Sequence, residues 1–252
     1  MNREYRNREW LYDKYINEKL STTQIGEICG IKNVNIWKWL RRFSIPIRSC
    51  GDAIHLVNGN HCDLSKKAIE WINGELLGDG CLCSRSKQSA RFTYTSQYKE
   101  YIEYIKNTLM TFGIIGITYE HKNKKTDKYD KCYKSRAYAE LLQIYKQWYP
   151  EGKKIIPKDV ELTPLTCRQW YIGDGSLINK EKKYQSIKLC TCGFSINDVD
   201  YLVIKLLKIG FNSTRQPSLN IIHILSCSAN DFLYYIGDCP VNCYQYKWGY
   251  FK

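Results

Sequence analysis

The stretch INGELLGDG at residues 72–80 has a counterpart, CRQWYIGDG, at residues 167–175. In each stretch, an apolar segment with helical spacing ends in Gly-Asp-Gly. One Gly-Asp-Gly is usually only a turn, whereas two copies on matched helices indicate an internal duplication. Each aspartate would emerge at a helix C-terminus, where the helix dipole disfavours negative charge. A cation shared by Asp79 and Asp174 would relieve that conflict.

The first stretch resembles the signature of the LAGLIDADG homing endonucleases and aligns with it along its whole length. The second copy departs at its third position, where Gln169 replaces a glycine that normally lets two helix backbones approach closely. We therefore expect the two signature helices to pack asymmetrically. The terminal Gly-Asp-Gly is intact in both copies, which favours retention of the family's chemistry.

The resemblance covers about residues 64–252. KKIIPK at residues 153–158 looks like the connector of single-chain members, and YKW at residues 246–248 looks like their C-terminal segment. The resemblance implies an α/β (α+β) fold of two αββαββα halves, residues 64–160 and 161–252, related by a pseudo-two-fold axis. In such a fold, two saddle-shaped sheets straddle DNA and the signature helices form the seam between them.

The pattern of apolar residues also predicts the order helix–hairpin–helix–hairpin–helix in each half. In the first hairpin, alternation points Phe92 and Tyr94 toward a core, and it points Arg91, Thr93 and Thr95 toward a wet, basic face.

The N-terminal residues 1–48 contain the ingredients of a helix-turn-helix. A helical run at 3–20 is followed by a short helix at 24–29 with Ile25 and Ile28 facing inward, a glycine turn, and a basic helix at 33–43. The functional interpretation places the basic helix in a major groove of DNA. Its candidate contacts are Asn33, Asn35, Lys38, Arg41 and Arg42. The alternative is a small helical cap whose charges are merely solvated. Residues 49–63 look like an extended linker.

The composition points to a polyanionic partner. The net charge is +13, and no basic amphipathic anchor accompanies it, so nucleic acid is favoured over a membrane. No run of about 18 apolar residues exists, which excludes a membrane-spanning helix. The N-terminal sequence MNREYRNREW is charged and lacks an apolar signal segment, which predicts a cytoplasmic protein.

The cysteines do not predict a structural metal. The chain has 12 of them, but no paired Cys-x2-Cys sets with zinc-ribbon spacing. Cys50, His55, His61 and Cys62 are spaced too irregularly for a zinc site. Reduced and mostly buried thiols are the better interpretation.

Phosphodiester hydrolysis needs an activated water and stabilisation of charge on phosphorus, and a hard divalent cation supplies both. Asp79 and Asp174 are the proposed ligands, and the resemblance adds the backbone carbonyls of Gly78 and Gly173. It also implies two or three Mg²⁺ ions, with Mn²⁺ able to substitute and Ca²⁺ supporting binding without cleavage. The alternative is that the aspartates only cap turns.

Lys154 and Lys247 match the family's active-site basic residues, which organise solvent and offset charge on the phosphate. Lys153, next to Lys154, is an alternative, and a solvated surface lysine is the plain interpretation at each position. The candidate DNA contacts on the sheets are Arg85, Lys87, Arg91, Thr93, Lys188, Arg215 and Gln216.

The leading prediction is a monomeric, Mg²⁺-dependent endonuclease that cuts double-stranded DNA at a specific site, across the minor groove, and leaves staggered ends. An intron maturase that binds RNA without cutting DNA remains open. A third possibility is a DNA-binding regulator built on a LAGLIDADG scaffold. Loss of either aspartate would favour these alternatives, and both aspartates are present.

Overall fold

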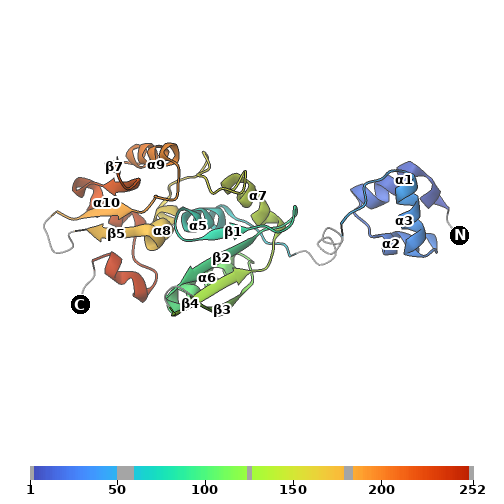
Figure 1. The fold of residues 1–252 in the computed structure, drawn as a ribbon, viewed down its shortest axis with the longest axis horizontal. Coiled ribbons are helices and arrows are strands. Elements are labelled where there is room, and N and C mark those ends of the chain that lie inside the picture. The colour runs from blue at the N-terminus through green and yellow to red at the C-terminus, as the bar shows by residue number, and fades with distance from the viewer. Residues whose placement is uncertain (1–2, 50–59, 124–126, 179–183, 250–252) are drawn as a thin grey trace. The chain divides into compact units, whose positions relative to one another are not determined.

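The computed structural model describes residues 3–49, 60–123, 127–178 and 184–249 (Figure 1). The chain divides into two compact units, residues 1–59 and 60–252. Each unit has a hydrophobic core of its own. None of the helices within the described ranges is long and apolar enough to cross a lipid bilayer.

The first unit is a small bundle of short helices. They are η1 (Glu4–Arg6), α1 (Arg8–Tyr12), the π-helical turn η2 (Asp13–Asn17), α2 (Thr22–Cys29) and α3 (Asn33–Arg42). The predicted helical run at 3–20 is therefore broken into a 3-10, an α and a π segment. The short helix and the basic helix lie where the sequence pattern predicts them.

Local signals explain how α2 begins and ends. Ser21 and Gln24 form a reciprocal capping box at its N-terminus. Gly30, with φ +66°, adopts the left-handed conformation that ends the helix. The helix buries Ile25 and Cys29, while Ile28 is 51% exposed, so the expectation that Ile28 faces inward is wrong. A Cβ at Gly26 would lie 2.6 Å from the carbonyl oxygen of Ile31, so this close backbone contact sets which face of α2 points inward.

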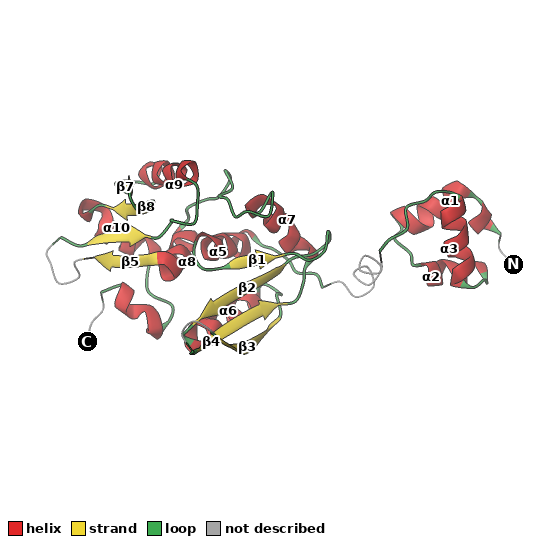
Figure 2. Ribbon diagram, in the orientation of Figure 1, coloured by secondary structure: helices red, strands yellow, loops and turns green. Residues whose placement is uncertain are grey.

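The second unit consists of two halves with the same element order, and the predicted αββαββα plan is confirmed (Figure 2). The first half contains α5 (Lys66–Leu77), β1 (Cys81–Cys83), β2 (Arg91–Ser96), α6 (Lys99–Thr111), β3 (Gly116–Lys122), β4 (Tyr129–Ser135) and α7 (Ala139–Trp148). The second half contains α8 (Pro164–Asp174), β5 (Gly175–Ile178), β6 (Ser186–Leu189), α9 (Ile196–Lys208), β7 (Ser213–Gln216), β8 (Ile221–Ile224), α10 (Ser226–Ile236) and the 3-10 helix η3 (Asn242–Lys247).

Each half forms an antiparallel four-stranded sheet with one face covered by helices. The strand orders are β1-β2-β4-β3 and β5-β6-β8-β7. Helices α6 and α7 pack on the first sheet, and α9 and α10 pack on the second. Phe92, Tyr94 and Tyr133 are buried beneath the helices of the first half, and Arg91 and Thr93 lie on the open face, as the alternation predicts.

The predicted linker extends too far toward the C-terminus. Asn60 forms a β-bridge with Tyr138, and the Cys62 thiol donates a hydrogen bond of 3.7 Å to Glu140. The chain therefore joins the second unit at Asn60 rather than at residue 64. Cys50 and His55, two of the irregularly spaced cysteines and histidines, lie outside the described residues.

Helices α5 and α8 pack side by side at the seam between the halves (Figure 1). A Cβ at Gly74 would lie 2.5 Å from the carbonyl oxygen of Thr166 and 2.8 Å from the Cβ of Gln169. A Cβ at Gly78 would lie 3.3 Å from the Cα of Gly173. The two helices therefore touch backbone to backbone, at distances that only glycine permits at Gly74.

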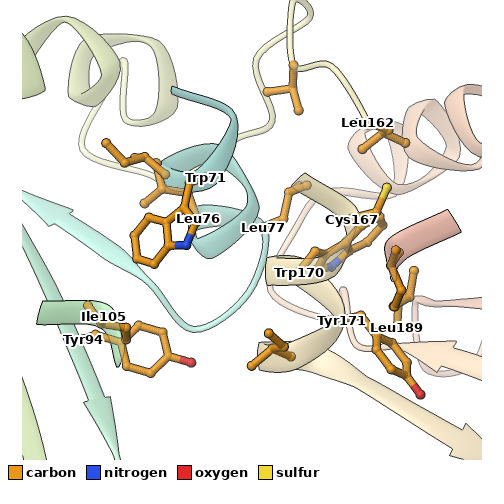
Figure 3. Packing of buried hydrophobic residues seen from close by; sticks show 14 of the residues in the cluster. Trp71, Leu76, Leu77, Tyr94, Ile105, Leu162, Cys167, Trp170, Tyr171 and Leu189 are labelled. Atoms are coloured by element: carbon orange, nitrogen blue, oxygen red, sulfur yellow. The ribbon is translucent and has the colours of Figure 1, made fainter. Parts of the chain in front are cut away.

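Apolar side chains radiate from this helix pair into both halves. In Figure 3, Trp71 and Tyr94 lie on one side of the pair, whereas Cys167 and Tyr171 lie on the other. All of these side chains belong to one continuous cluster of buried residues. The seam is thus also the centre of the core of the second unit.

A buried polar network accompanies the seam on one side. The Tyr101 hydroxyl donates to Oε1 of Glu75 at 2.6 Å, and it lies 3.4 Å from Oε1 of Gln169. The amide of Gln169 donates to the Tyr104 hydroxyl at 3.1 Å. These partners of Gln169 belong to the first half. The departure from glycine at position 169 therefore makes the seam asymmetric, as expected.

Replacing Gly74 by alanine should destabilise the second unit by about 1–3 kcal/mol, because the added methyl group overlaps the backbone of α8. The matched control is Gly193→Ala, because a Cβ at Gly193 would meet no atom within 4 Å. Urea unfolding of both variants measures the difference. Equal stability of Gly74→Ala and wild type would contradict the close packing.

Glu75 should make stability fall as the pH rises. Burial raises the pKa of this carboxyl to about 8, although the hydrogen bond from Tyr101 favours the charged form. In the unfolded chain, the Glu75 carboxyl ionises at its ordinary pKa of about 4.3. Between the two pKa values, the free energy of unfolding therefore falls by up to about 1.4 kcal/mol per pH unit. Glu75→Gln should therefore gain stability relative to wild type at pH 9, but not at pH 5.

Urea unfolding of Glu75→Gln and wild type at both pH values gives this difference directly. Glu103→Gln on α6 is the matched control, since the Glu103 side chain is 40% exposed. A stability difference between Glu75→Gln and wild type that is the same at pH 5 and pH 9 would rule out this effect.

Candidate active site and nucleic-acid interface

The two signature aspartates meet at the end of the seam. Helix α5 ends at Leu77, the backbone turns out of the helix at Gly78, and Asp79 follows directly. Helix α8 continues to Asp174. A Cβ at Gly173 would lie 3.1 Å from the backbone nitrogen of Asp79, so the glycine contact brings both Gly-Asp pairs together. Asp79 is exposed and Asp174 is half-buried.

The carboxyl groups repel each other. The pKa of Asp174 is raised to about 7, first by burial and then by the negative charge of Asp79. The ammonium groups of Lys154 and Lys247 act in the opposite direction without cancelling this effect. The Tyr94 hydroxyl donates to Oδ2 of Asp79 at 3.5 Å, which is a weak contact. The site therefore concentrates negative charge that the protein itself leaves partly uncompensated.

Each signature helix receives a lysine at its C-terminal end. Nζ of Lys154 donates to the carbonyl oxygens of Gly78 at 3.2 Å and Gly80 at 3.0 Å. Nζ of Lys247 donates to the carbonyl oxygens of Ile172 and Gly173, the latter at 3.0 Å. Carbonyls at helix C-termini lack intrahelical partners and favour a positive charge, so these contacts satisfy both requirements.

The two lysines hold equivalent places in the duplicated fold. Lys154 follows α7 and Lys247 ends η3, after α10, so each comes after the last α-helix of its half. Burial lowers the pKa of Lys154, and the neighbouring Cys81, Asp174 and Asp79 oppose that shift. Lys153 is exposed, which makes Lys154 the better candidate of the adjacent pair.

The donor set fits a hard divalent cation. Two carboxylates and the carbonyls of Gly78 and Gly173 offer oxygen atoms, and a carbonyl that accepts one lysine hydrogen bond retains a second lone pair. Within the described residues, no group of three or more His, Cys, Asp and Glu side chains could hold a metal ion. Two carboxylates with carbonyl oxygens suit a hard divalent cation, whose remaining ligands would be water and substrate phosphates.

The open faces of both sheets carry several of the sequence candidates. Arg91 and Thr93 lie on the open face of the first sheet, and Arg85 and Lys87 are exposed between β1 and β2. On the second sheet, Lys188 pairs in register with His223 and points away from the helices. Gln216 lies on the same face, by alternation along β7.

Arg215 differs from the other candidates. It pairs in register with the fully buried Ile222, and its Nε lies 2.7 Å from Oδ1 of Asp200 on α9. Its side chain therefore belongs to the helix-covered face. Because Arg215 is basic and lies in a strand, the sequence makes it a candidate for DNA contact. Its side chain, however, points to the helix-covered face of the sheet and not to the open face.

Sequence reasoning missed other residues on the open faces. Lys134 stands beside Thr93 and Ile117 in register, and Ile117 is 65% exposed. Tyr119 on the same strand is 45% exposed, and His223 lies beside Lys188. Lys134 alternates with the buried Tyr133 and Ser135, and His223 alternates with the buried Ile222 and Ile224, so strand alternation could have identified both.

In the first unit, α3 exposes Asn33, Asn35, Lys38, Arg41 and Arg42. The Arg41 guanidinium lies 4.8 Å from the ring centroid of Trp37, and that of Arg42 lies 4.8 Å from Trp39. Trp37 is 40% exposed and Val34 is 55% exposed, although both are apolar. The outer face of α3 therefore combines basic, amide and apolar groups, which are the side-chain types that contact base edges and thymine methyl groups.

Comparisons with known proteins agree with this geometry. Residues 69–230 match the LAGLIDADG DNA endonuclease family. An uncharacterised protein of Methanocaldococcus jannaschii is 30% identical over 210 residues, which cover 80% of this chain and 79% of that protein. A cytochrome b mRNA maturase of Debaryomyces hansenii is 27% identical over 192 residues, which cover 71% of each chain.

Among solved structures, the homing endonuclease I-WcaI bound to its DNA recognition sequence is similar, with a TM-score of 0.64 and 22% sequence identity. The similarity covers 81% of this chain and 95% of that one, and it shows a shared fold. The family match spans most of both signature helices and the sheets between and beyond them. The resemblance seen in the sequence is thereby confirmed, and the chain belongs to the LAGLIDADG DNA endonuclease family.

Proposed function

We propose that this protein is a site-specific endonuclease that cuts both strands of DNA with the help of divalent metal ions. The observation that carries the proposal is the meeting of Asp79 and Asp174 at the seam, each beside carbonyls that receive a lysine. One carboxylate from each half gives one site for each strand. Because both halves are in one chain, the protein would act as a monomer.

The carboxylates of Asp79 and Asp174, with the carbonyls of Gly78 and Gly173, would hold two or three Mg²⁺ ions. When bound, Mg²⁺ supplies a Lewis acid for the phosphate and lowers the pKa of water. Mn²⁺ would substitute, whereas Ca²⁺ would support DNA binding without cleavage. The half-buried position of Asp174 limits its contact with bulk water, which strengthens its interaction with any cation.

Lys154 and Lys247 would offset negative charge as it develops on the phosphate. Their ammonium groups are already fixed by carbonyl oxygens, so little reorganisation would accompany the reaction. Their places at equivalent positions in the two halves support one such group per strand.

The open sheet faces would form the duplex-binding surface. Basic residues such as Lys134 and Lys188 would contact phosphates, which position DNA but carry no sequence information. Arg91, Thr93 and Gln216 are the candidates for contacts with bases. By resemblance to the family, cleavage would occur across the minor groove and leave staggered ends.

The first unit would add a second DNA contact through α3. Its exposed Asn33, Lys38 and Arg41 would enter a major groove, in the manner of a helix-turn-helix. This contact would lengthen the recognition site and increase affinity without taking part in the reaction.

An RNA-binding maturase is the second candidate function. The observation that favours it is the similarity to the Debaryomyces hansenii maturase over 71% of each chain. A maturase would not require both aspartates and both lysines in equivalent places. Their presence favours the endonuclease and gives less support to a regulator that only binds DNA.

Asp79→Asn and Asp174→Asn should each abolish double-strand cleavage, because each removes one charged oxygen donor from the site. Nicked product would remain if each half serves one strand. DNA affinity in Ca²⁺ should change little, since most affinity comes from phosphate contacts elsewhere. A randomised DNA library incubated with Mg²⁺ and scored for cut ends supplies the substrate. Full double-strand cleavage by either variant would reject the assignment.

Lys247→Met should slow single-turnover cleavage by roughly 100–1,000-fold, the usual effect of removing one electrostatic donor. DNA affinity should stay nearly constant. Lys153→Met is the control, because Lys153 is an exposed lysine next to the equivalent residue of the first half. Unaltered single-turnover cleavage on saturated Lys247→Met would remove Lys247 from the active site.

Removal of residues 1–59 should shorten the DNA footprint, weaken binding, and make log K depend less steeply on log salt. The slope should decrease by about 0.9 for each phosphate that the truncated protein no longer binds. The double variant Lys38→Ala, Arg41→Ala in the full chain should reproduce part of the change without a truncation. An unchanged footprint and slope in both proteins would show that the first unit is a structural cap.

A further inference from the structure

Two pairs of cysteines lie close to the signature aspartates: Cys81 and Cys83 form β1, the edge strand of the first sheet, and Cys190 and Cys192 follow β6 of the second sheet. Sγ of Cys81 is 3.8 Å from Sγ of Cys83, and Sγ of Cys190 is 3.5 Å from Sγ of Cys192. We propose that each pair is a site of reversible oxidation, which closes into a disulfide within the chain and weakens binding of DNA.

The local backbone explains why the thiols meet. In each pair a buried residue separates the cysteines: Leu82 is 2% exposed and Thr191 is 1% exposed. Residues two apart in a strand point to the same side, so burial of Leu82 in β1 turns Cys81 and Cys83 outward together. Cys190 and Cys192 follow the end of β6 at Leu189 and flank the buried Thr191. Cys83, Cys190 and Cys192 are exposed, so a small oxidant can reach both sites.

The spacing of Cys81 and Cys83 permits a disulfide with a local change of the strand. Residues two apart in a strand have Cα atoms about 6.6 Å apart. Disulfides form at Cα separations of about 4.4–6.8 Å, so the Cys81–Cys83 pair in β1 falls near the upper limit. Closure therefore shortens and bends the strand edge locally instead of leaving it unchanged.

The other cysteines that the structure describes are less suited to this reaction. Cys29, Cys132 and Cys167 are buried. Burial raises the pKa of the thiols of Cys62 and Cys243 and also those of Cys83 and Cys190, so acidity does not distinguish the proposed pairs. Within the described ranges, the two proposed pairs are those whose sulfur atoms touch.

Oxidised glutathione is a suitable oxidant by its chemistry. One cysteine thiolate attacks its disulfide, forms a mixed disulfide and releases one glutathione thiolate. The second cysteine thiolate then attacks the protein sulfur of that bond and releases the second glutathione. The protein gains one S–S bond and loses two electrons, which reduce the glutathione disulfide, and the two thiol protons end on the two glutathione molecules.

Both pairs are close enough to the aspartates for closure to affect the DNA surface. Cys81 lies two positions after Asp79, and Cys83 pairs in register with Arg91 on the open face. The backbone N–H of Cys190 donates to the carbonyl oxygen of Asp174 at 2.9 Å. This effect on DNA rests on the proposed function, whereas the disulfides themselves do not.

The first experiment maps the disulfides. The full chain is incubated with oxidised glutathione at pH 8.5, quenched with N-ethylmaleimide, and analysed by peptide mass spectrometry. We expect the peptides with Cys81–Cys83 and with Cys190–Cys192 each to lose the mass of two hydrogens and to resist alkylation. In Cys83→Ser and Cys192→Ser, the remaining cysteine of the altered pair should retain glutathione, because no second thiol displaces it.

Complete alkylation of both pairs, a stable glutathione adduct in the wild type, or pairing with other cysteines would each overturn the proposal. The second experiment measures DNA affinity in Ca²⁺ before and after oxidation. Affinity should fall at least about tenfold, the equivalent of one well-formed polar contact, and dithiothreitol should restore it.

The variant with serine at all four positions (Cys81→Ser, Cys83→Ser, Cys190→Ser, Cys192→Ser) should be insensitive to oxidised glutathione. If the oxidised wild-type protein binds DNA as tightly as the reduced one, the effect on DNA is wrong. In that case the endonuclease proposal is unaffected, since it is tested with the reduced protein and its aspartate variants.

Discussion

The backbone contact between α5 and α8 is the constraint on which the second unit depends. Gly74, Gly78 and Gly173 let the two helices approach more closely than side chains would allow. That approach places the tryptophans and leucines of both helices in one core. It also decides where the two Gly-Asp pairs end.

The same contact creates an electrostatic problem at the end of the seam. Two helix C-termini and two carboxylates converge there, and all of them are negative in character. Two lysines supplied by distant segments relieve the carbonyls, yet the pKa of Asp174 remains raised to about 7. A site that is left with excess negative charge and open oxygen donors is well suited to divalent cations.

Much of this arrangement could be predicted from the sequence, because a duplicated motif and strand alternation are local signals. Lys154 and Lys247 were expected from the resemblance to the family, and the structure puts both on signature carbonyls. The errors concern which face a side chain occupies. Ile28 and Arg215 each fit their local pattern, but the packing of Gly26 and the strand register turned them the other way. The face that a side chain occupies depends on packing against residues that are distant in the sequence.

The asymmetry at Gly74 and Gln169 restricts how this chain could have evolved. A Cβ at position 74 would come within 2.8 Å of the Cβ of Gln169. Positions 74 and 169 are equivalent and lie against each other at the pseudo-two-fold axis, so a dimer of two second halves packed in this way would place two glutamines in that space. Glutamine was therefore tolerable only after the other copy was fixed as glycine in the same chain. While Gln169 is present, a larger residue at position 74 is disfavoured, so two copies of the second half would not pack together as α5 and α8 do.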